Sequence, residues 1–262
     1  MHTVRIGFGY SVSIVRHQEY TKALSELDAL VFPELLDGGY AALKRGLSPH
    51  TPNDPLLTII REASERFPCT IIAGTVYYHD GTDSPTNTTL VFSRGKLIHR
   101  YDKIHLFKPT DDHVFFRSGK PVARTFKLAT RAGTLRAGVV ICYDLRFPEL
   151  VRVMASKGMQ VLFVPARWPA ERDLAWRTLL LARAIENQIF VLGCNARDIE
   201  GGRSYAFDPL GEKLFLSPPS QASLLSVCEL DLAKLSHART LHSNLQDAIF
   251  LKAVLKQIKG IT

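Results

Sequence analysis

The sequence predicts an α/β protein in which mixed β-sheets are covered by helices. Apolar runs typical of strands alternate with amphipathic helical segments, and hairpins interrupt this alternation. A pure β-α-β alternation would indicate one parallel sheet, whereas hairpins add antiparallel pairs. The chain has 262 residues, of which 46% are hydrophobic, and this is ample for one large core. Two stacked sheets between helical layers fit this pattern.

The first half of the chain contains both kinds of segment. Short apolar runs indicate strands, and apolar residues at helical spacing indicate helices. The turn Ser93-Arg94-Gly95 separates two strand-like runs and so predicts a hairpin. We predict strands at 4–8, 29–32, 70–77, 88–92 and 96–101, and helices at 20–27 and 55–67.

The second half follows the same rules, with another hairpin that turns at Arg131-Ala132-Gly133. From about residue 237 the pattern is less regular, and we expect a C-terminal arm there on a single domain spanning residues 1–262. We predict strands at 125–129, 135–141, 161–164, 189–195, 205–207, 213–215 and 223–229, and helices at 147–156 and 174–186.

The net charge says little about macromolecular partners. The chain has 33 Lys and Arg against 25 Asp and Glu, a formal net charge of +8. Its basic residues are spread out rather than clustered, so we expect no nucleic-acid partner. The positive field of the protein could instead attract a small acidic substrate. The alternative is that the excess of positive charge has no function.

The cysteine positions and the hydropathy argue against a disulfide-rich, a metal-binding or a membrane protein. The four cysteines, Cys69, Cys142, Cys194 and Cys228, are scattered and form no motif with metal-ligand spacing. We therefore expect neither a disulfide framework nor a metal site. No apolar run is long enough to span a bilayer, and the N-terminus enters a strand without an apolar signal segment. We expect no membrane partner and a cytoplasmic location.

Cys142 is the strongest candidate for a reactive residue. It follows the apolar run Gly138-Val139-Val140-Ile141, and Phe147-Pro148-Glu149 starts a helix shortly after it. A thiol at such a strand-to-helix turn has backbone N–H groups directed at its reaction site, where they can stabilise an oxyanion. An inert core thiol is the alternative, and it is what we expect of the other three cysteines.

Glu34 and Lys103 also stand at the ends of predicted strands. Reactive groups of α/β proteins gather at such ends, so the three side chains meet if their strands lie side by side. A Lys favours the thiolate, a carboxylate can take the thiol proton, and the Lys can then stabilise an oxyanion. The set therefore supports acyl transfer to Cys142 and hydrolysis of a carbon–nitrogen bond. Taken singly, Glu34 could be a cap and Lys103 a surface residue paired with Asp102.

These residues stand in motifs that resemble those of the nitrilase, or carbon-nitrogen hydrolase, superfamily. The motifs occur in the family's order and cover nearly the whole chain. They read Phe32-Pro33-Glu34, Tyr101-Asp102-Lys103-Ile104-His105-Leu106-Phe107, Cys142-Tyr143-Asp144-Leu145-Arg146-Phe147-Pro148-Glu149, Ala182-Arg183-Ala184-Ile185-Glu186-Asn187-Gln188-Ile189-Phe190-Val191, and Ser204 with Asp208-Pro209-Leu210-Gly211-Glu212.

The resemblance implies a four-layer αββα sandwich of two mixed sheets, dimerised through its helical faces. It also implies that Glu34 acts as general base and acid, that Lys103 stabilises the oxyanion and that Cys142 is the nucleophile. The backbone N–H of Tyr143 would share the oxyanion hole. Neither a cofactor nor a metal is implied.

One segment departs from the family pattern. Many members carry a second Glu after the Lys, in a Phe-x-Glu-x-Gly context, and Arg117 stands at that place here. Asp112 and His113 are the candidates to contact Lys103 instead, and a polar loop without contact to the site is the alternative.

The segment from Pro165 to Arg172 resembles the Trp-Pro-x-x-Arg segment of the branch that contains bacterial ω-amidases. That branch hydrolyses amides bearing a carboxylate, such as 2-oxoglutaramate, with ammonia release through a thioester. A cationic and aromatic pocket would suit such a substrate. Arg146 is expected to brace the elbow by pairing with a carboxylate such as Glu149. The candidate substrate-binding residues are Arg167, Trp168 and Arg172, with Tyr40, Phe107, His113 and Phe116 as walls.

Other functions remain open. An N-carbamoyl amino acid or amine hydrolase and a nitrilase would use the same thiol on a related carbon. A non-catalytic binding module is the alternative from another class, and the intact Glu34, Lys103 and Cys142 argue against it.

Overall fold

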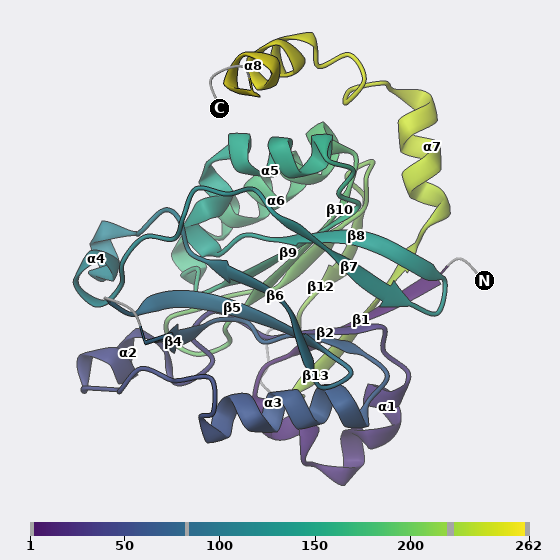
Figure 1. The fold of residues 1–262 in the computed structure, drawn as a ribbon. Helices are drawn as coiled ribbons and strands as arrows, with labels where there is room; N and C mark the ends of the chain where they lie inside the picture. The colour runs from purple at the N-terminus through teal and green to yellow at the C-terminus, as the bar shows by residue number, and fades with distance from the viewer. Residues whose placement is uncertain (1–2, 82–83, 219–222, 260–262) are drawn as a thin grey trace.

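The computed structural model describes residues 3–81, 84–218 and 223–259. Across these residues the strands form two sheets, and helices cover the outer faces (Figure 1). Both sheets contain parallel and antiparallel pairs, so the predicted α/β class with mixed sheets is confirmed. Within the same ranges, no helix combines the length and hydropathy needed to cross a membrane.

The first sheet has the strand order β13-β1-β2-β3-β5-β4, with β6 paired to β5. Strands β1, β2 and β3 are parallel neighbours, whereas β13, β5, β4 and β6 add antiparallel pairs. Its strands are β1 (Thr3–Gly9), β2 (Ala29–Val31), β3 (Thr70–Ile72), β4 (Val76–Tyr78), β5 (Thr86–Ser93), β6 (Lys96–Asp102) and β13 (Leu225–Asp231).

The second sheet has the order β12-β11-β10-β9-β8-β7, with β8, β9 and β10 parallel and the outer pairs antiparallel. The two β-hairpins predicted from the sequence are β5–β6 in the first sheet and β7–β8 in the second. Its strands are β7 (Thr125–Thr130), β8 (Gly133–Val139), β9 (Val161–Ala166), β10 (Phe190–Asn195), β11 (Tyr205–Phe207) and β12 (Lys213–Leu216).

The main core lies between the two sheets. Apolar side chains of β1 and β2 pack there with those of β8, β9 and β10. The rings of Phe8 and Phe215 stack across the sandwich, 4.6 Å between centroids. Helices α5 (Pro148–Ser156) and α6 (Asp173–Asn187) lie on the second sheet, and α1 (Thr21–Ser25) and α3 (Pro55–Arg66) lie on the first (Figure 1).

Local sequence signals set several helix ends. The Asp54 side chain accepts a hydrogen bond from the backbone N–H of Leu56, and Pro55 occupies the first position of α3, where its missing N–H costs nothing. Pro148 has the same place in α5. The prediction missed four short or C-terminal helices: α2 (Gly39–Lys44), α4 (Asp112–Phe115), α7 (Ala233–Leu241) and α8 (Ile249–Lys259).

Helix α7 spans residue 237, at which the sequence predicts the start of an arm. Leu235 and Ala238 of this helix are buried, and the Gln188 side chain donates to the carbonyls of Ala238 and His242, both at 2.7 Å. These contacts attach α7 to the end of α6. Helix α8 follows and leaves Phe250 exposed to solvent.

The predicted strand at 70–77 is wrong in one respect, because it is broken into β3 and β4. Gly74 lies between them with φ of +55°, and a Cβ added there would lie 2.0 Å from the carbonyl oxygen of Pro33. The backbone of Gly74 therefore packs directly on the segment that carries Glu34. A regular strand could not make this approach.

Replacing Gly74 with alanine should lower the free energy of unfolding by at least about 3 kcal/mol, because the left-handed backbone strain and the clash with Pro33 add. Gly46 is the matched control, since its φ is +89° but no atom lies within 4 Å of an added Cβ. Gly46→Ala should cost only about 1–2 kcal/mol. Urea denaturation measures both values, and equal losses would contradict the proposed contact.

Candidate active site

Glu34, Lys103 and Cys142 come together at the ends of strands from both sheets. Glu34 follows β2 and Lys103 follows β6, and these strands run in the same direction in the first sheet. Cys142 follows β8 of the second sheet. The three strands do not lie side by side in one sheet, so the condition under which the side chains were expected to meet is not the one that the structure uses. Stacking of the sheets brings the thiol over the two charged side chains.

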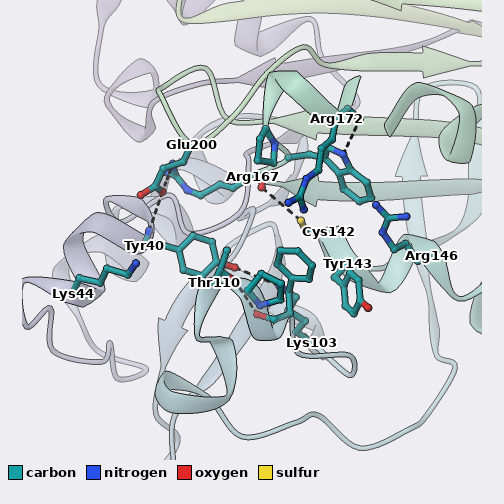
Figure 2. A pocket seen from close by; sticks show the side chains of 14 residues that line it. Tyr40, Lys44, Lys103, Thr110, Cys142, Tyr143, Arg146, Arg167, Arg172 and Glu200 are labelled. Atoms are coloured by element: carbon teal, nitrogen blue, oxygen red, sulfur yellow. Dashed lines mark hydrogen bonds and ion pairs between the residues drawn. The ribbon is translucent and has the colours of Figure 1, made fainter. Parts of the chain in front are cut away.

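The cavity that these ends surround has a volume of about 260 Å³ (Figure 2). It is smaller than the roughly 300–1,000 Å³ of sites for drug-sized ligands, so it suits a small molecule. Five of its lining side chains are basic and one is acidic. The lining residues are Tyr40, Lys44, Lys103, Phe107, Pro109, Thr110, Cys142, Tyr143, Arg146, Arg167, Trp168, Pro169, Arg172 and Glu200.

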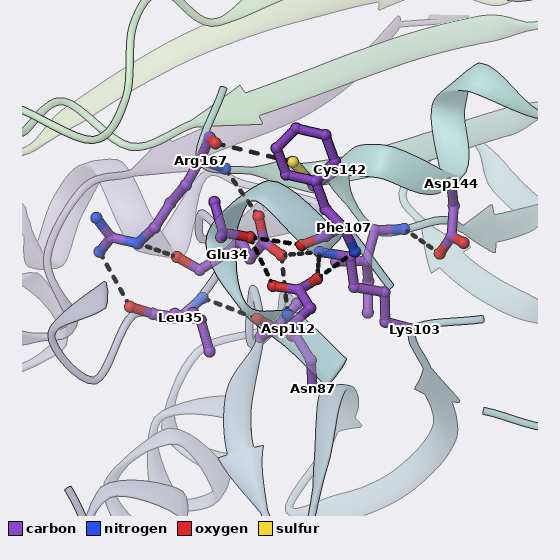
Figure 3. Close-up of polar contacts among 12 residues, drawn as sticks. Glu34, Leu35, Asn87, Lys103, Phe107, Asp112, Cys142, Asp144 and Arg167 are labelled. Atoms are coloured by element: carbon purple, nitrogen blue, oxygen red, sulfur yellow. Dashed lines mark hydrogen bonds and ion pairs between the residues drawn. The ribbon is translucent and has the colours of Figure 1, made fainter. Parts of the chain in front are cut away.

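Lys103 is a buried cation held between two buried carboxylates (Figure 3). Its Nζ lies 2.8 Å from Glu34 Oε1 and 2.8 Å from Asp112 Oδ2. Burial alone would lower the pKa of Lys103, but the negative charge of Glu34 outweighs this effect and raises it well above its usual value. Lys103 therefore stays protonated. Besides the two carboxylates, Nζ contacts only the Tyr40 hydroxyl among the described residues, at the long distance of 3.5 Å, and a ligand that replaced this contact would gain the third N–H group.

Four donors hold the Glu34 carboxylate in place. Besides Lys103, Oε1 accepts from Asn87 Nδ2 at 2.8 Å and from the Tyr40 hydroxyl at 3.4 Å. Oε2 accepts from the backbone N–H of Arg167 at 3.0 Å. The acidic group is thus fixed in orientation, as a general base requires. The sequence analysis did not single out Asn87, although Thr86-Asn87-Thr88-Thr89 is an unusually polar run for a buried strand.

Cys142 begins the 3₁₀ turn Cys142–Arg146 with φ of +45°, a conformation that is uncommon outside glycine. The residue is 8% exposed, and Sγ lies 3.8 Å from the carbonyl oxygen of Arg167. Burial and then the charge of Glu34 raise the pKa of this thiol well above its usual value, against the opposing charge of Lys103. The thiol is therefore neutral at rest and needs a base to become a nucleophile.

Asp144 braces this turn. Its buried carboxylate accepts from the Tyr101 hydroxyl at 2.8 Å, from the backbone N–H of Ile141 at 3.2 Å and from the backbone N–H of His105 at 2.8 Å. Tyr101 and His105 flank Lys103 in sequence. One side chain thus ties the nucleophile turn to the segment that carries the cation.

The predicted binding residues are only partly brought together. Five of them line the cavity as expected: Tyr40, Phe107, Arg167, Trp168 and Arg172. His113 does not, because its side chain is exposed outside the lining.

Two further side chains are placed differently from the expectation. Phe116 is buried beside Tyr77, with 5.5 Å between ring centroids, and is not part of the lining. Arg146 lines the cavity, with its guanidinium carbon 4.8 Å from the Trp168 ring centroid, and among the described residues no ion pair joins it to Glu149. The proposed brace by Arg146 is therefore corrected, and Asp144 has that place.

The Arg167 side chain holds the backbone segment that carries Glu34. Its guanidinium donates to the carbonyl oxygens of Glu34 at 2.8 Å and Leu35 at 3.0 Å, and it pairs with Asp198 and Glu200. The side chain is buried, so these contacts occupy donors that a substrate would need. Glu200 was not foreseen, because a lone acid in a loop carries no sequence signal.

Asp112 makes the polar contact to Lys103 that the sequence analysis expected from Asp112 or His113. Its Oδ2 contacts Lys103 Nζ and accepts from the Phe107 N–H at 2.9 Å, while Oδ1 accepts from Thr110 Oγ1 at 2.9 Å. Arg117 lies elsewhere, and its Nε donates to the carbonyl of Ser84. Of the two candidates from sequence, the structure thus places Asp112 and not His113 on Lys103.

Asp112→Asn should lower kcat by about 10-fold or more, because Lys103 loses one of two charged partners and its Nζ is less firmly held. Asp111→Asn is the matched control, since Asp111 is an exposed neighbour, and it should change kcat by less than twofold. Steady-state kinetics of both variants make the comparison. Unchanged kinetics for Asp112→Asn would exclude a contribution of Asp112.

The arrangement contains a fixed carboxylate, a permanent cation and a thiol at one end of a small cavity. Such a set can take a proton, stabilise an oxyanion and form a thioester. Tyr143 lies in the first turn after the thiol, where a backbone N–H has no partner within the helix. Within the described ranges, no group of three or more His, Cys, Asp or Glu side chains is arranged to hold a metal ion.

Comparisons with known proteins identify related sequences. The sequence profile of the carbon-nitrogen hydrolase family matches residues 14–240. The chain is 34% identical over 214 residues to the "hydrolase in agr operon" of Staphylococcus lugdunensis, which covers 79% of this chain and 89% of that protein. It is 32% identical over 216 residues to the 2-oxoglutaramate amidase of Bacillus subtilis, with 80% and 82% covered.

A solved structure shares the fold. Nit3 of Saccharomyces cerevisiae, a member of branch 10 of the nitrilase superfamily, matches with a TM-score of 0.77 at 23% identity. The match covers 92% of this chain and 94% of that chain. The nitrilase-like arrangement of two mixed sheets flanked by helices is thereby confirmed.

Proposed function

The chain belongs to the carbon-nitrogen hydrolase family, and on this basis we propose that it is a cysteine-dependent amidase acting on a small amide that bears a carboxylate. We take 2-oxoglutaramate as the representative substrate, and hydrolysis of its amide would release ammonia. One observation carries the proposal: Lys103 and Cys142 line a cavity of about 260 Å³ whose lining is mainly basic and aromatic, and the buried Glu34 lies directly behind them, 2.8 Å from Lys103 Nζ. A basic lining favours an anionic substrate.

The reaction would proceed in two halves. Glu34 takes the proton of the neutral Cys142 thiol as Sγ attacks the amide carbon. The oxygen of that carbon becomes negative and is stabilised by Lys103 Nζ and the Tyr143 N–H. Glu34 then gives the proton to the nitrogen, the C–N bond breaks, and ammonia leaves a thioester on Cys142.

Hydrolysis of the thioester completes the cycle. Glu34 takes a proton from water, and the resulting hydroxide adds to the thioester carbon at the same oxyanion hole. Collapse of this intermediate breaks the C–S bond, and the proton returns to the departing sulfur. The products are a carboxylic acid and the free thiol.

The test is a panel of substrates with ammonia release as readout. It contains 2-oxoglutaramate, N-carbamoyl amino acids and nitriles, and the Cys142→Ala variant is the control for background hydrolysis. Turnover of 2-oxoglutaramate above the others supports the proposal. Turnover of a carbamoyl compound or a nitrile without any amide turnover would replace it by the corresponding hydrolase.

Thiol labelling addresses the alternative of a non-catalytic binding module. Cys142 lines the cavity, whereas Cys69, Cys194 and Cys228 are buried away from it. Iodoacetamide should therefore modify Cys142 first, as mapped by mass spectrometry. Equal resistance of all four thiols would favour a binding module.

We extend the proposal to the oligomeric state and the cellular location of the enzyme. We expect a homodimer formed through the helical face of α5 and α6, where Leu174 is 67% exposed and Ile185 is 45% exposed. We also expect the enzyme to act in the cytoplasm. Sedimentation analysis of the purified protein tests the first expectation, and a monomer at micromolar concentration would exclude it.

A further inference from the structure

Glu200 joins two segments that hold the candidate base Glu34. Its Oε2 accepts from the backbone N–H of Tyr40 at 3.0 Å, and its Oε1 accepts from that of Ala41 at 2.9 Å (Figure 2). Oε2 also lies 3.2 Å from Nη1 of Arg167. One side chain from the loop between β10 and β11 thus bridges the start of α2 and the end of β9.

Arg167 lies between the base and the nucleophile (Figure 3). Its backbone N–H donates to Glu34 Oε2 at 3.0 Å, and its carbonyl oxygen lies 3.8 Å from Cys142 Sγ. Its guanidinium donates to the carbonyl oxygens of Glu34 at 2.8 Å and Leu35 at 3.0 Å. The position of Arg167 therefore sets both the orientation of the Glu34 carboxylate and its place relative to the sulfur.

Tyr40 is the second route from Glu200 to the base. The Tyr40 hydroxyl donates to Glu34 Oε1 at 3.4 Å, and the same hydroxyl lies 3.5 Å from Lys103 Nζ. Both contacts are long, so a small shift of the Tyr40 backbone would break them. Glu200 restrains that backbone through the N–H groups of Tyr40 and Ala41.

The backbone next to Glu34 needs such support. Leu35 has φ of +46°, in the left-handed region that is uncommon outside glycine. A strained conformation of this kind persists where the surrounding contacts fix it. The Leu35 N–H donates to Thr75 Oγ1 at 2.8 Å, and its carbonyl accepts from Arg167. The guanidinium that pairs with Glu200 is therefore one of the groups that fix the strained residue beside the base.

Gly39 shows how closely α2 packs on the Glu200–Arg167 ion pair. Its φ is +69°, and a Cβ added there would lie 2.4 Å from Glu200 Oε2 and 2.6 Å from the guanidinium carbon of Arg167. A larger residue would therefore displace the pair. The first residue of α2 is in direct contact with both charged groups, so the three segments have little freedom to move separately.

Asp198 is the other acid beside Arg167, with its Oδ2 2.5 Å from Nη1. Its side chain is 50% exposed, against 24% for Glu200. Among the described residues, no hydrogen bond joins Asp198 to α2. Asp198 therefore adds negative charge near the guanidinium, whereas Glu200 also links the guanidinium to Tyr40.

We propose that Glu200 is a positioning residue that keeps Glu34 within reach of Cys142. It acts through two neighbours, Arg167 and Tyr40, and takes no part in the proton transfers. The inference rests on the proposed amidase function, because transfer of the thiol proton needs the base at a fixed distance. Glu200 lines the cavity, but both of its oxygens are already engaged by N–H donors.

The first test is the kinetics of Glu200→Gln. Glutamine keeps the size of the side chain, but its NH₂ group faces an N–H donor where a carboxylate oxygen accepted. The kcat for 2-oxoglutaramate should fall about 10- to 100-fold because the reacting groups are displaced, while KM should stay within about threefold. Glu171→Gln is the matched control, since Glu171 is exposed and does not line the cavity, and it should change both constants by less than about twofold.

Alkylation of Cys142 gives a readout that requires no amide turnover. The buried thiol is neutral at rest, so its reaction with iodoacetamide also needs a base. Glu200→Gln should slow this modification about 10-fold or more, because Glu34 is displaced. Asp198→Asn should slow it less than about threefold, since the bridge to α2 remains. Mass spectrometry of the modified peptide gives both rates.

Gly39→Ala tests the same contact without removing a charge. The added methyl group displaces the Glu200–Arg167 pair, so kcat and the alkylation rate should fall as in Glu200→Gln. Gly46→Ala is the matched control, because it has φ of +89° shortly after α2 but meets no atom within 4 Å. It should change both rates by less than about twofold. These two variants decide the question if Glu200→Gln does not fold.

The outcomes separate the positioning role from the amidase proposal. Unchanged kcat and alkylation in Glu200→Gln, or in Gly39→Ala if the first variant does not fold, would overturn the positioning role. A rise in KM at constant kcat would also overturn it, because Glu200 would then be a substrate contact. So would an equal loss in Asp198→Asn, since the charge around Arg167 would then be decisive. Slower alkylation in Glu200→Gln of a protein that hydrolyses no amide would support the positioning role while the amidase proposal fails.

Discussion

Cys142→Ala is expected to reduce kcat for amide hydrolysis by at least about 10⁴-fold, because the covalent route through a thioester is lost. Glu34 and Lys103 should remain in place, because they are held by each other, by Asn87 and by Asp112 rather than by the sulfur. Substrate should therefore still bind, with KM or Kd changed only a few-fold. Ammonia release in a coupled assay gives kcat, and calorimetry gives binding.

Cys69→Ala is the matched control for this variant. Cys69 is also a buried thiol, but it lies before β3 and does not line the cavity. Loss of the Cys69 side chain should leave kcat within twofold and cost about 1–2 kcal/mol of the free energy of unfolding, because a small cavity forms in the core.

Rapid quenching of the unaltered enzyme with substrate should also trap the acyl group on Cys142, seen as a mass increase in the intact protein. Full activity in Cys142→Ala would remove the basis of the mechanism.

Lys103→Met should have the largest combined effect on stability and activity. The methionine leaves Glu34 and Asp112 as buried carboxylates without their common cation. Removal of one partner from a buried ion pair costs about 3–5 kcal/mol of the free energy of unfolding. The oxyanion would also lose its charged donor, so kcat should fall by at least about 10²–10³-fold.

The double variant Lys103→Met/Asp112→Asn separates charge from packing. It removes one of the two uncompensated carboxylates, so part of the lost stability should return while kcat stays low. Lys108→Met is the control, because Lys108 is exposed and no ion pair involving it is seen among the described residues. Urea denaturation of all three variants makes the comparison. A Lys103→Met protein as stable as the control would contradict the buried ion network.

Periodicity predicted most elements to within a few residues, because burial of one face imposes a repeat on the sequence. The long helix at 174–186 is α6, and the hairpin at 125–129 and 135–141 is β7–β8. The failures have local causes. The strand at 70–77 breaks at Gly74, where packing against Pro33 outweighs strand propensity. Helix α2 is short, and Glu200, which accepts from the Tyr40 and Ala41 N–H groups, lies far away in sequence.

The residues of the candidate site also fall into those that the sequence identified and those that only the structure showed. Glu34, Lys103 and Cys142 were identifiable because each ends a strand and their chemistry is complementary. Asn87 and Asp144 were not singled out, since a buried polar side chain acquires a partner only in the folded chain. Arg146 and Arg167 both line the cavity, although only Arg167 was predicted to do so. The guanidinium of Arg167 is held by carbonyls and that of Arg146 lies over a ring, and these groups come from segments distant in sequence.

By itself, the sequence determined that this is an α/β protein with mixed sheets and a Glu, a Lys and a Cys at strand ends. These properties follow from local periodicity and from the chemistry of single residues. Only the tertiary structure decided that the thiol comes from one sheet and the two charged groups from the other, with Asp112 as the second partner of Lys103. The physical reason is that sheet stacking and buried ion pairing join residues distant in sequence, and no local pattern encodes those distances.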